Sequence, residues 1–151
     1  GALLYTGGGI VPKDLLSILG LKILHIHPGY LPDVKGSDGL LWSLISRSRL
    51  GASSFYMEPG IDTGQIILAR EFDPIIFPIG ALDRPENMML YRALFALYDP
   101  ILRAKVLQET LALGDDPACF EAHTQTVSDG ITYHFMHLEI RKIALRRLFP
   151  E

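Results

Sequence analysis

Two histidines and one aspartate have the types and spacing to do chemistry in this chain. His25 and His27 end an apolar run and are followed by Pro28, and Asp62 lies in a turn flanked by glycines. Imidazole and carboxylate groups can transfer protons near neutral pH, and they can also bind metal ions. An unperturbed imidazole titrates at about pH 6.5, so His27 could serve in either protonation state.

The elements around these residues must bring them to one edge of a sheet. Successive side chains of a strand point to opposite faces, so His25 and His27 share one face and Ile26 takes the other. Pro28 disfavours helix at the preceding residue and cannot donate to a sheet ladder, so we expect His27 to be the last residue of its strand. Ligands of open α/β sheets bind at that carboxyl edge.

The apolar spacing along the rest of the chain predicts an α/β domain. We expect strands at 2–6, 22–27, 52–57, 65–72 and 131–136, and helices at 12–19, 38–49, 84–114 and 137–149. The order strand, helix, strand over 2–27 predicts parallel pairing, and the short connection between 52–57 and 65–72 predicts an antiparallel pair. The result is a mixed, mostly parallel sheet flanked by helices. Ser37 or Asp38 could cap the second helix.

Composition limits the classes of function. The chain has 151 residues, 48% of them hydrophobic and 21% charged, which is typical of one globular domain. A formal net charge of −3 gives no electrostatic footprint for nucleic acid or an anionic membrane. A single cysteine, Cys119, excludes an internal disulfide and fits a reducing compartment. With no apolar run long enough to span a bilayer, we expect a cytoplasmic protein.

The central stretch resembles the formyltransferases that use 10-formyltetrahydrofolate. The family includes the glycinamide ribonucleotide, methionyl-tRNA and sugar N-formyltransferases and formyltetrahydrofolate deformylase. The resemblance spans residues 2 to 72, and its motifs are His27-Pro28, Leu31-Pro32, Gly36, Trp42, Gly51 with Ser53, and Asp62-Thr63-Gly64.

This resemblance implies a partial Rossmann-like formyltransferase fold. Residues 1–72 would form the catalytic core, which is the C-terminal half of the family domain, because the part of the family pattern that comes first does not precede Gly1. Residues 73–151 would form a helical and irregular extension packed on the same domain. Since residues 2–6 would then leave a sheet edge exposed, we also expect a homo-oligomer.

The resemblance also implies how the residues would act. His25, His27 and Asp62 would be catalytic, in the transfer of a formyl group from 10-formyltetrahydrofolate to a small amine-bearing substrate through a tetrahedral intermediate. His27 would polarise the formyl oxygen or relay a proton, and Asp62 would orient His27 and accept the proton of the amine. His25 stands where the family has Asn, and a histidine donates only in the right tautomer or when protonated.

Two walls of a folate site are implied as well. One wall would be the loop formed by Gly7, Gly8, Gly9, Ile10 and Val11. The other would be formed by Glu58, Gly60 and Ile61. Folate and the amine substrate are therefore the expected partners, and no metal ligand is assigned.

Other interpretations stay open for the same residues. His25 and His27 could be histidines at a strand end that only satisfy a polar network. A formyltransferase-like fold with impaired catalysis could serve binding or assembly. The alternatives that keep an activity are a formyltetrahydrofolate hydrolase and a metal-dependent hydrolase, since two histidines on one strand face with a distant aspartate also form a metal-ligand pattern.

Overall fold

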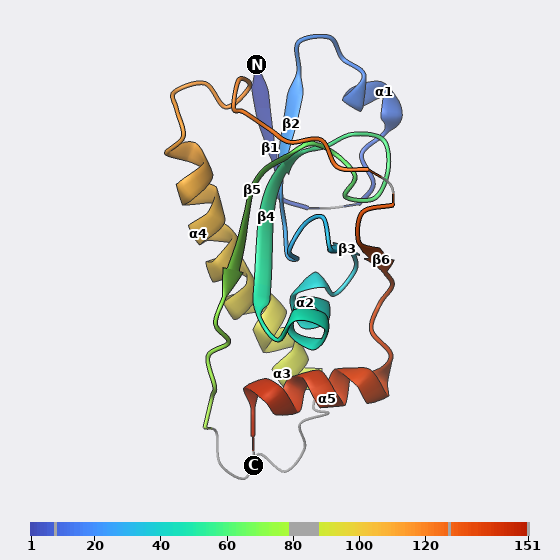
Figure 1. Cartoon of the computed structure of the whole chain (residues 1–151), viewed down its shortest axis with the longest axis vertical. Coiled ribbons are helices and arrows are strands. Elements are labelled where there is room, and N and C mark those ends of the chain that lie inside the picture. The colour runs from blue at the N-terminus through green and yellow to red at the C-terminus, as the bar shows by residue number, and fades with distance from the viewer. Residues whose placement is uncertain (8, 79–87, 127, 151) are drawn as a thin grey trace.

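A four-stranded mixed sheet forms the centre of the chain in a computed structural model that describes residues 1–7, 9–78, 88–126 and 128–150. Its strands lie in the order β1-β2-β4-β5 and are β1 (Ala2–Tyr5), β2 (Lys22–His27), β4 (Leu50–Tyr56) and β5 (Ile66–Phe72) (Figure 1). As predicted, β2 ends at His27, β1 and β2 are parallel, and β4 and β5 are antiparallel.

The prediction that this sheet is mostly parallel is wrong. Strand β4 runs antiparallel to β2 as well as to β5, so two of the three neighbouring pairs are antiparallel. A parallel strand needs a crossover that returns the chain to the far end of the sheet. The connection here contains only the short β3 (Val34–Gly36) and α2 (Gly39–Arg47), and β4 begins at the end where β2 stops, with Ser53 opposite His27.

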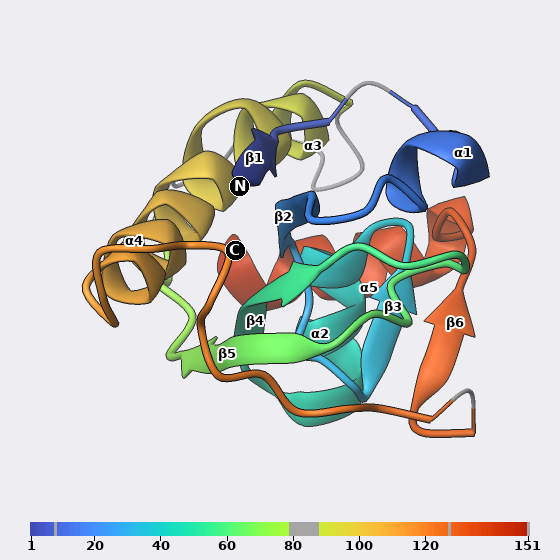
Figure 2. The ribbon, with the colours of Figure 1, turned by 90° about the horizontal axis from the view of Figure 1, so that it is seen from above.

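The two faces of β4 meet different parts of the chain. Ala52 and Ser54 face α4 (Asp99–Leu111), where Ala52 packs with Val106, and the Thr110 hydroxyl donates to the Ser54 oxygen at 2.7 Å. On the other face the Ser53 hydroxyl donates to the carbonyl of Gly29 in the loop after β2. Figure 2 shows α4 on one side of the sheet and the loop and α2 on the other. That second face carries both histidines.

The helical run before α4 continues into it without a gap. Helix α3 (Met88–Ala93) continues through a π-helical turn, η1 (Leu94–Tyr98), into α4, which has Pro100 in its first turn. Proline lacks the N–H of an α-helical ladder and crowds the preceding turn, and a π turn widens the backbone there. Residues 84–87 of the predicted helix lie outside the described residues.

Asp38 does not cap α2 with its side chain, contrary to the prediction. It adopts a left-handed conformation with φ 53°, and its carboxylate accepts instead from the Tyr91 hydroxyl at 2.6 Å and the Met136 backbone N–H at 2.8 Å. Burial, with this hydrogen bond second, raises the pKa of Tyr91 to about 12. Asp38 thus joins α2 to two distant parts of the chain.

A second, two-stranded sheet and the last helix cover the end of the molecule where α2 lies. Strand β3 (Val34–Gly36) pairs in parallel with β6 (Ile131–Tyr133), and α5 (Leu138–Leu148) packs on α2. Helices α2 and α5 form one apolar cluster with η1 and α4, which includes Leu40, Leu44, Leu94, Leu102, Leu145 and Leu148. The division of the chain at residue 72 stays a prediction, since segments from both sides of it build this cluster.

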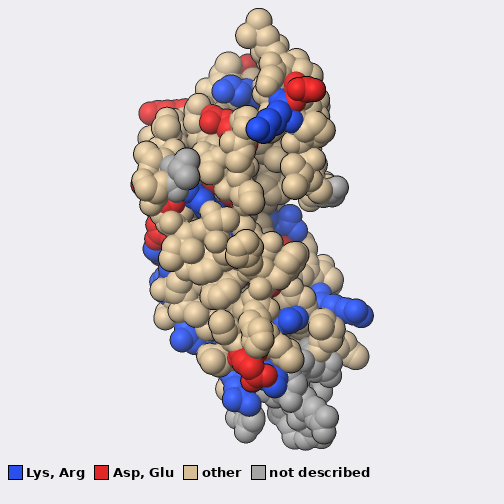
Figure 3. All heavy atoms as spheres, turned by 90° about the vertical axis from the view of Figure 1, so that its right-hand side faces the viewer, with Lys and Arg blue, Asp and Glu red and all other residues tan. Residues whose placement is uncertain are grey.

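Exposed apolar and charged groups are distributed unevenly. On the free edge of β1, Leu3 and Leu4 are about half exposed (53% and 45%). On the side that carries α1 (Lys13–Leu16) and β6, charged side chains gather toward the two ends and are sparse across the middle (Figure 3). Among the described residues, no helix combines the length and the apolar character required to cross a membrane.

Candidate functional site

The carboxyl end of β2 presents His25 and His27 on one face, as their spacing predicts. In the antiparallel register with β4, His25 lies opposite Phe55 and His27 lies opposite Ser53. Both strands are almost entirely buried here; β4 pairs with the backbone of both histidines, and β1 pairs with His25 on the other side. The two rings nevertheless have different surroundings.

The ring of His27 is buried, with 2% of the residue exposed, and both of its nitrogens have neighbours. Nε2 lies 2.9 Å from the carbonyl oxygen of Val34, and Nδ1 lies 3.4 Å from Oδ2 of Asp62. Glycine is required beside the ring, because a Cβ at Gly29 would stand 2.5 Å from Nε2. The Pro-Gly sequence after His27 therefore makes room for the ring as well as ending the strand.

Hydrogen-bonding chemistry fixes the proton on one nitrogen of His27. A carbonyl oxygen only accepts, so Nε2 donates to Val34 and a neutral ring leaves Nδ1 without a proton. Burial lowers the pKa of His27, although the Asp62 carboxylate and the Val34 carbonyl both act to raise it. The neutral ring is favoured at pH 7, which corrects the expectation that either form is available. A hydrogen bond between Nδ1 and Asp62 then needs one additional proton, shared by this pair.

Asp62 takes an uncommon backbone conformation that aims its carboxylate at the end of β2. Its φ is 52°, in the left-handed region that aspartate tolerates better than most residues. Oδ2 accepts from the backbone N–H of Gly36 at 2.8 Å, and 16% of the side chain is exposed. The structure brings Asp62 within 3.4 Å of His27, with Gly36 as a second neighbour of the carboxylate, and the predicted roles of the two side chains stay predictions.

His25 is held by β1 rather than by the other two candidates. Its Nδ1 lies 2.8 Å from the carbonyl oxygen of Tyr5, so Nδ1 is the donor, and Nε2 of a neutral ring is an acceptor. The ring stands edge-on to Phe55, with 5.7 Å between centroids, and is tilted against Tyr5. In this tautomer His25 does not offer the N–H that an asparagine would.

A cavity of about 350 Å³ lies beside these residues. Of the predicted catalytic residues it is lined by His25 and Asp62, whereas His27 lies behind its wall. Its lining also includes six of the predicted folate-site residues, namely Gly9, Ile10, Val11, Glu58, Gly60 and Ile61. Gly7 is not part of the lining, and Gly8 lies outside the described residues.

Six residues that the sequence did not single out also line this cavity. Tyr5 and Phe55 flank His25, and the Tyr5 hydroxyl donates to the carbonyl of Gly9, which ties the glycine loop to β1. The wall is completed by Lys13 and Leu16 from α1 and by Met57 and Pro59 after β4. The antiparallel register of β2 and β4 could have identified Phe55, but the sequence carries no comparable signal for Tyr5 or Lys13.

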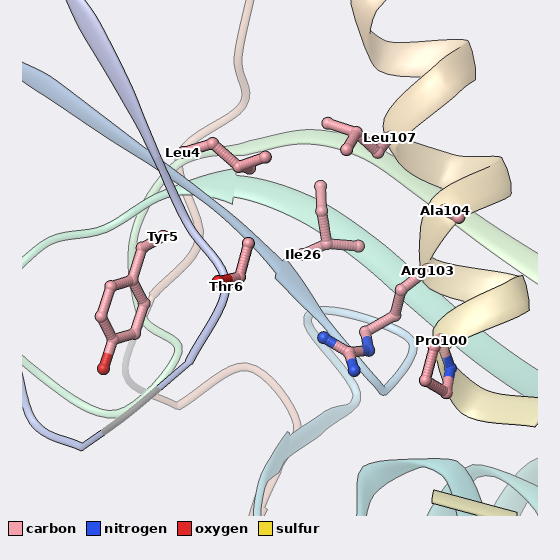
Figure 4. Close-up of a pocket in the computed structure, with 8 residues that line it drawn as sticks. All are labelled: Leu4, Tyr5, Thr6, Ile26, Pro100, Arg103, Ala104 and Leu107. Atoms are coloured by element: carbon pink, nitrogen blue, oxygen red, sulfur yellow. The ribbon is translucent and has the colours of Figure 1, made fainter. Parts of the chain in front are cut away.

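A smaller cavity, of about 140 Å³, opens on the opposite face of the sheet between β1, β2 and α4. Figure 4 shows Arg103 reaching from α4 toward the strand that carries Ile26. Its Nε donates to the buried carboxylate of Asp99 at 2.8 Å, and its charge contributes to lowering the pKa of His27. Tyr5 lines both cavities, so the two open on either side of the end of β1.

The described part of the chain holds no group of three or more His, Cys, Asp or Glu side chains arranged to bind a metal ion. His25 and His27 have different partners, Tyr5 and the Val34–Asp62 pair. The arrangement offers the Asp62 carboxylate and the His25 imidazole at the edge of the cavity, with the His27 imidazole beside Asp62, a set that suits proton transfer.

Comparisons with known proteins, by sequence and by structure, point to one family. A family model described as formyl transferase matches residues 4–79. The methionyl-tRNA formyltransferase of Clostridioides difficile is 35% identical over 124 residues, which are 78% of this chain and 36% of that protein. The chain spans between 21% and 36% of the length of the eight curated relatives that were compared in detail, each named methionyl-tRNA formyltransferase.

Two solved structures illustrate the fold. The formyltransferase PseJ from Anoxybacillus kamchatkensis, in complex with a formamido sugar nucleotide and tetrahydrofolate, superposes with a TM-score of 0.61 at 23% identity. The match covers 87% of this chain and 63% of that one. HypX from Aquifex aeolicus in complex with tetrahydrofolic acid has a TM-score of 0.56 at 18% identity, over 97% of this chain and 25% of that one. These likenesses show a mixed, Rossmann-like α/β fold.

Proposed function

Because this chain belongs to the formyl transferase family, we propose that it takes part in the transfer of a formyl group from 10-formyltetrahydrofolate to a small amine-bearing substrate. The observation that carries the proposal is the cavity where His25 and Asp62 meet the loop of Gly9 and the turn of Gly60. A carboxylate and an imidazole at the edge of a cavity of this size fit acid–base chemistry on a bound group.

The walls of the cavity suit a folate. Phe55 and Ile61 offer apolar contact for a flat heterocycle, and the backbone of the glycine loop offers polar groups. Gly9 has φ 120°, and a Cβ there would meet no atom within 4 Å, so the backbone can come close to a ligand. The formyltransferase PseJ and HypX, both solved with tetrahydrofolate or tetrahydrofolic acid, support the same donor class for this site.

The reaction needs one proton acceptor beside the formyl carbon. The amine attacks that carbon, a new C–N bond forms, and the carbonyl oxygen becomes an oxyanion; the bond to N10 of the folate then breaks. We assign the acceptance of the amine proton to Asp62, because it lines the cavity, and the proton can then return to N10 of the leaving folate. Atoms and charge balance over these steps without a further reagent.

The burial of His27 favours one of the two roles that its sequence position leaves open. A ring that does not line the cavity cannot polarise a formyl oxygen directly, so the proposed role is to relay or hold a proton through Asp62. His25 lines the cavity and is the proposed neighbour of the oxyanion. Its tautomer makes it a poor donor unless the ring is protonated, because Nδ1 is already engaged by Tyr5.

Binding of the folate can be tested apart from turnover. Titration calorimetry with tetrahydrofolate should give saturable binding that Ile10→Glu weakens, because the new carboxylate in the cavity wall repels the acidic tail of folate. Leu19→Glu is the matched control: both side chains are almost fully exposed, and Leu19 does not line the cavity. Equal affinity of the two variants would argue against this cavity as the folate site.

Turnover is measured in the same preparations. Production of tetrahydrofolate from 10-formyltetrahydrofolate, with and without a panel of amines, distinguishes transfer from hydrolysis. Release that depends on an amine supports the proposal, and release without any amine points to a hydrolase. No release with either mixture would contradict the proposed reaction.

A second candidate is a binding module of the same fold without efficient catalysis. The observation that favours it is the hydrogen bond between His25 and Tyr5, which removes the donor expected at this position. Folate binding without turnover would be its signature. A homo-oligomer also stays a prediction, and the exposed Leu3 and Leu4 on the free edge of β1 are its structural support.

A further inference from the structure

A segment far along the chain wraps around the turn that carries Asp62. We call residues 123–126 and 128–133 the strap. His123 exchanges two backbone hydrogen bonds with Ile66, of 2.8 and 2.9 Å, and Lys35 donates from Nζ to the carbonyls of Thr126 and Asp129. Figure 2 shows the strap in orange, passing β5 on its way to β6, which lies beside β3. The strap is therefore fixed at several points.

Gln125 makes the contact between the strap and the Asp62 turn. Only 8% of this residue is exposed, and its Nε2 donates to the carbonyl of Asp62 at 2.8 Å and to the carbonyl of Gly64 at 2.7 Å. One amide group thus holds the turn on both sides of Thr63. The two N–H groups of a single NH₂ are both used, which matches the geometry of two converging carbonyls.

The orientation of the Gln125 amide follows from these partners. Its Oε1 is buried and has no hydrogen-bond partner among the described residues. Rotating the amide by half a turn would set Oε1 against the carbonyl oxygens of Asp62 and Gly64 and would move the NH₂ group away from both of its acceptors. The two N–H donors of the amide therefore fix its orientation, and the Oε1 acceptor is left without a partner among the described residues.

The turn requires such a restraint. Asp62 has a left-handed backbone, a conformation that a residue with a Cβ keeps only when its surroundings enforce it. Its Oδ2 must also stay 2.8 Å from the N–H of Gly36 and within 3.4 Å of Nδ1 of His27. The contact with His27 is already long for a hydrogen bond, so a small displacement of the turn would remove it.

We propose that Gln125 is a positioning residue for Asp62, acting through the backbone of the turn. The residue lies outside the segment 4–79 that matches the family model. The expected effect of Gln125 on catalysis rests on the proposed function, whereas its expected effect on the contact between Asp62 and His27 does not. The strap is thereby part of the site and more than a surface covering.

The test compares Gln125→Leu with Ser128→Ala. Leucine has a similar volume and no donor, so both carbonyls of the turn lose their partner. Ser128→Ala removes only an exposed hydroxyl of the strap, which hydrogen-bonds with Thr126 at 2.8 Å, and serves as the control. The primary readout is the ¹⁵N NMR titration of the His27 ring, which requires no turnover.

The expected result is a pKa of His27 that is lower in Gln125→Leu than in the wild type. The Asp62 carboxylate raises this pKa, so moving it away allows burial and the charges of His25 and Arg103 to lower it further, with the Val34 hydrogen bond unchanged. Ser128→Ala should titrate as the wild type does. An unchanged titration in Gln125→Leu would overturn the proposal. A merely structural role would lower the melting temperature and leave the ring unaffected.

A kinetic measurement and a substitute variant complete the test. If the wild type has measurable turnover, Gln125→Leu should lower kcat roughly 10- to 100-fold with little change in the KM for the folate. A wild type without turnover would refute the proposed function, while the NMR comparison still decides on Gln125. If Gln125→Leu does not fold, Gln125→Asn takes its place: its amide is one methylene shorter and reaches one carbonyl at most, and a wild-type titration in that variant would overturn the proposal.

Discussion

Asp62→Asn separates the chemistry of the carboxylate from the architecture of its turn. Asparagine tolerates the left-handed backbone that Asp62 adopts, and its carbonyl oxygen can accept from Gly36 as Oδ2 does now. Because Oδ2 also lies nearest to Nδ1 of His27, the amide oxygen takes that position too, and its NH₂ group replaces Oδ1. The substitution therefore removes a negative charge and a proton acceptor while the contacts of the turn persist.

The two expected magnitudes differ enough to be distinguished. Replacing a charged acceptor by a neutral one at the Gly36 N–H costs about 1 kcal/mol. Loss of a general base lowers the rate by roughly 10²- to 10⁴-fold, which corresponds to about 3 to 5 kcal/mol of barrier. Stability should therefore change little while turnover is nearly abolished.

The assay combines single-turnover formyl transfer with urea unfolding of the same preparations. Asp62→Ala is the informative companion, because alanine loses the carboxylate as well as the tolerance of the left-handed conformation, which costs about 1 to 2 kcal/mol more. The reasoning fails if Asp62→Asn retains more than about a third of the wild-type rate, since the loss of a general base is expected to be at least about 100-fold. It also fails if Asp62→Asn is destabilised as much as Asp62→Ala.

Three other predictions concern the neighbours of Asp62 and the packing of the chain end. His25→Asn should raise turnover by about tenfold or more, because an amide N–H can donate to the oxyanion in every protonation state; an equal or lower rate in single-turnover assays would contradict this. Because burial lowers the pKa of His27, the unfolded chain binds a proton at this ring more readily than the folded chain does. The free energy of unfolding is therefore not reduced by this ring above about pH 6.5, and it falls as the pH drops below that value, by at most about 1.4 kcal/mol per pH unit. Urea unfolding at several pH values should show this slope, and His27→Gln should flatten it. Leu145→Ala, in the fully buried face of α5, should cost about 2 to 5 kcal/mol in one cooperative transition, whereas the exposed Ile143→Ala should change stability by less than about 0.5 kcal/mol; two separate transitions would contradict the packing of residues 73–151 on the same domain.

Local rules were enough to predict the part of the site that a single strand determines. The alternation of strand side chains put His25 and His27 on one face, and Pro28 fixed the end of β2. The turn around Asp62 and the antiparallel pair β4–β5 followed from glycines and from a short connection in the same way. Each of these features depends on residues close together in the sequence, where propensity and sterics dominate.

The rest depends on contacts between distant segments. Asp38 looked like a helix cap, but Tyr91 and Met136 compete for its carboxylate from more than 50 positions away. The burial of His27 depends on how β3 and its loop close over the ring, and the tautomer of His25 depends on its register with Tyr5. No local pattern encodes such distances, so the different surroundings of the two histidines could not be predicted from the sequence.

The parallel pairing of β3 with β6 has a consequence for the order in which the molecule can assemble during synthesis. Val34 is translated well before its partner Ile131. Pairings between residues so far apart carry a high entropic cost and form late. The sheet of β1, β2, β4 and β5 can be complete before Ile131 is made, whereas β3 gains its neighbour only afterwards. A chain cut before residue 131 would therefore keep the residues of that sheet and lack the strand that pairs with β3, whose Val34 carbonyl lies beside His27.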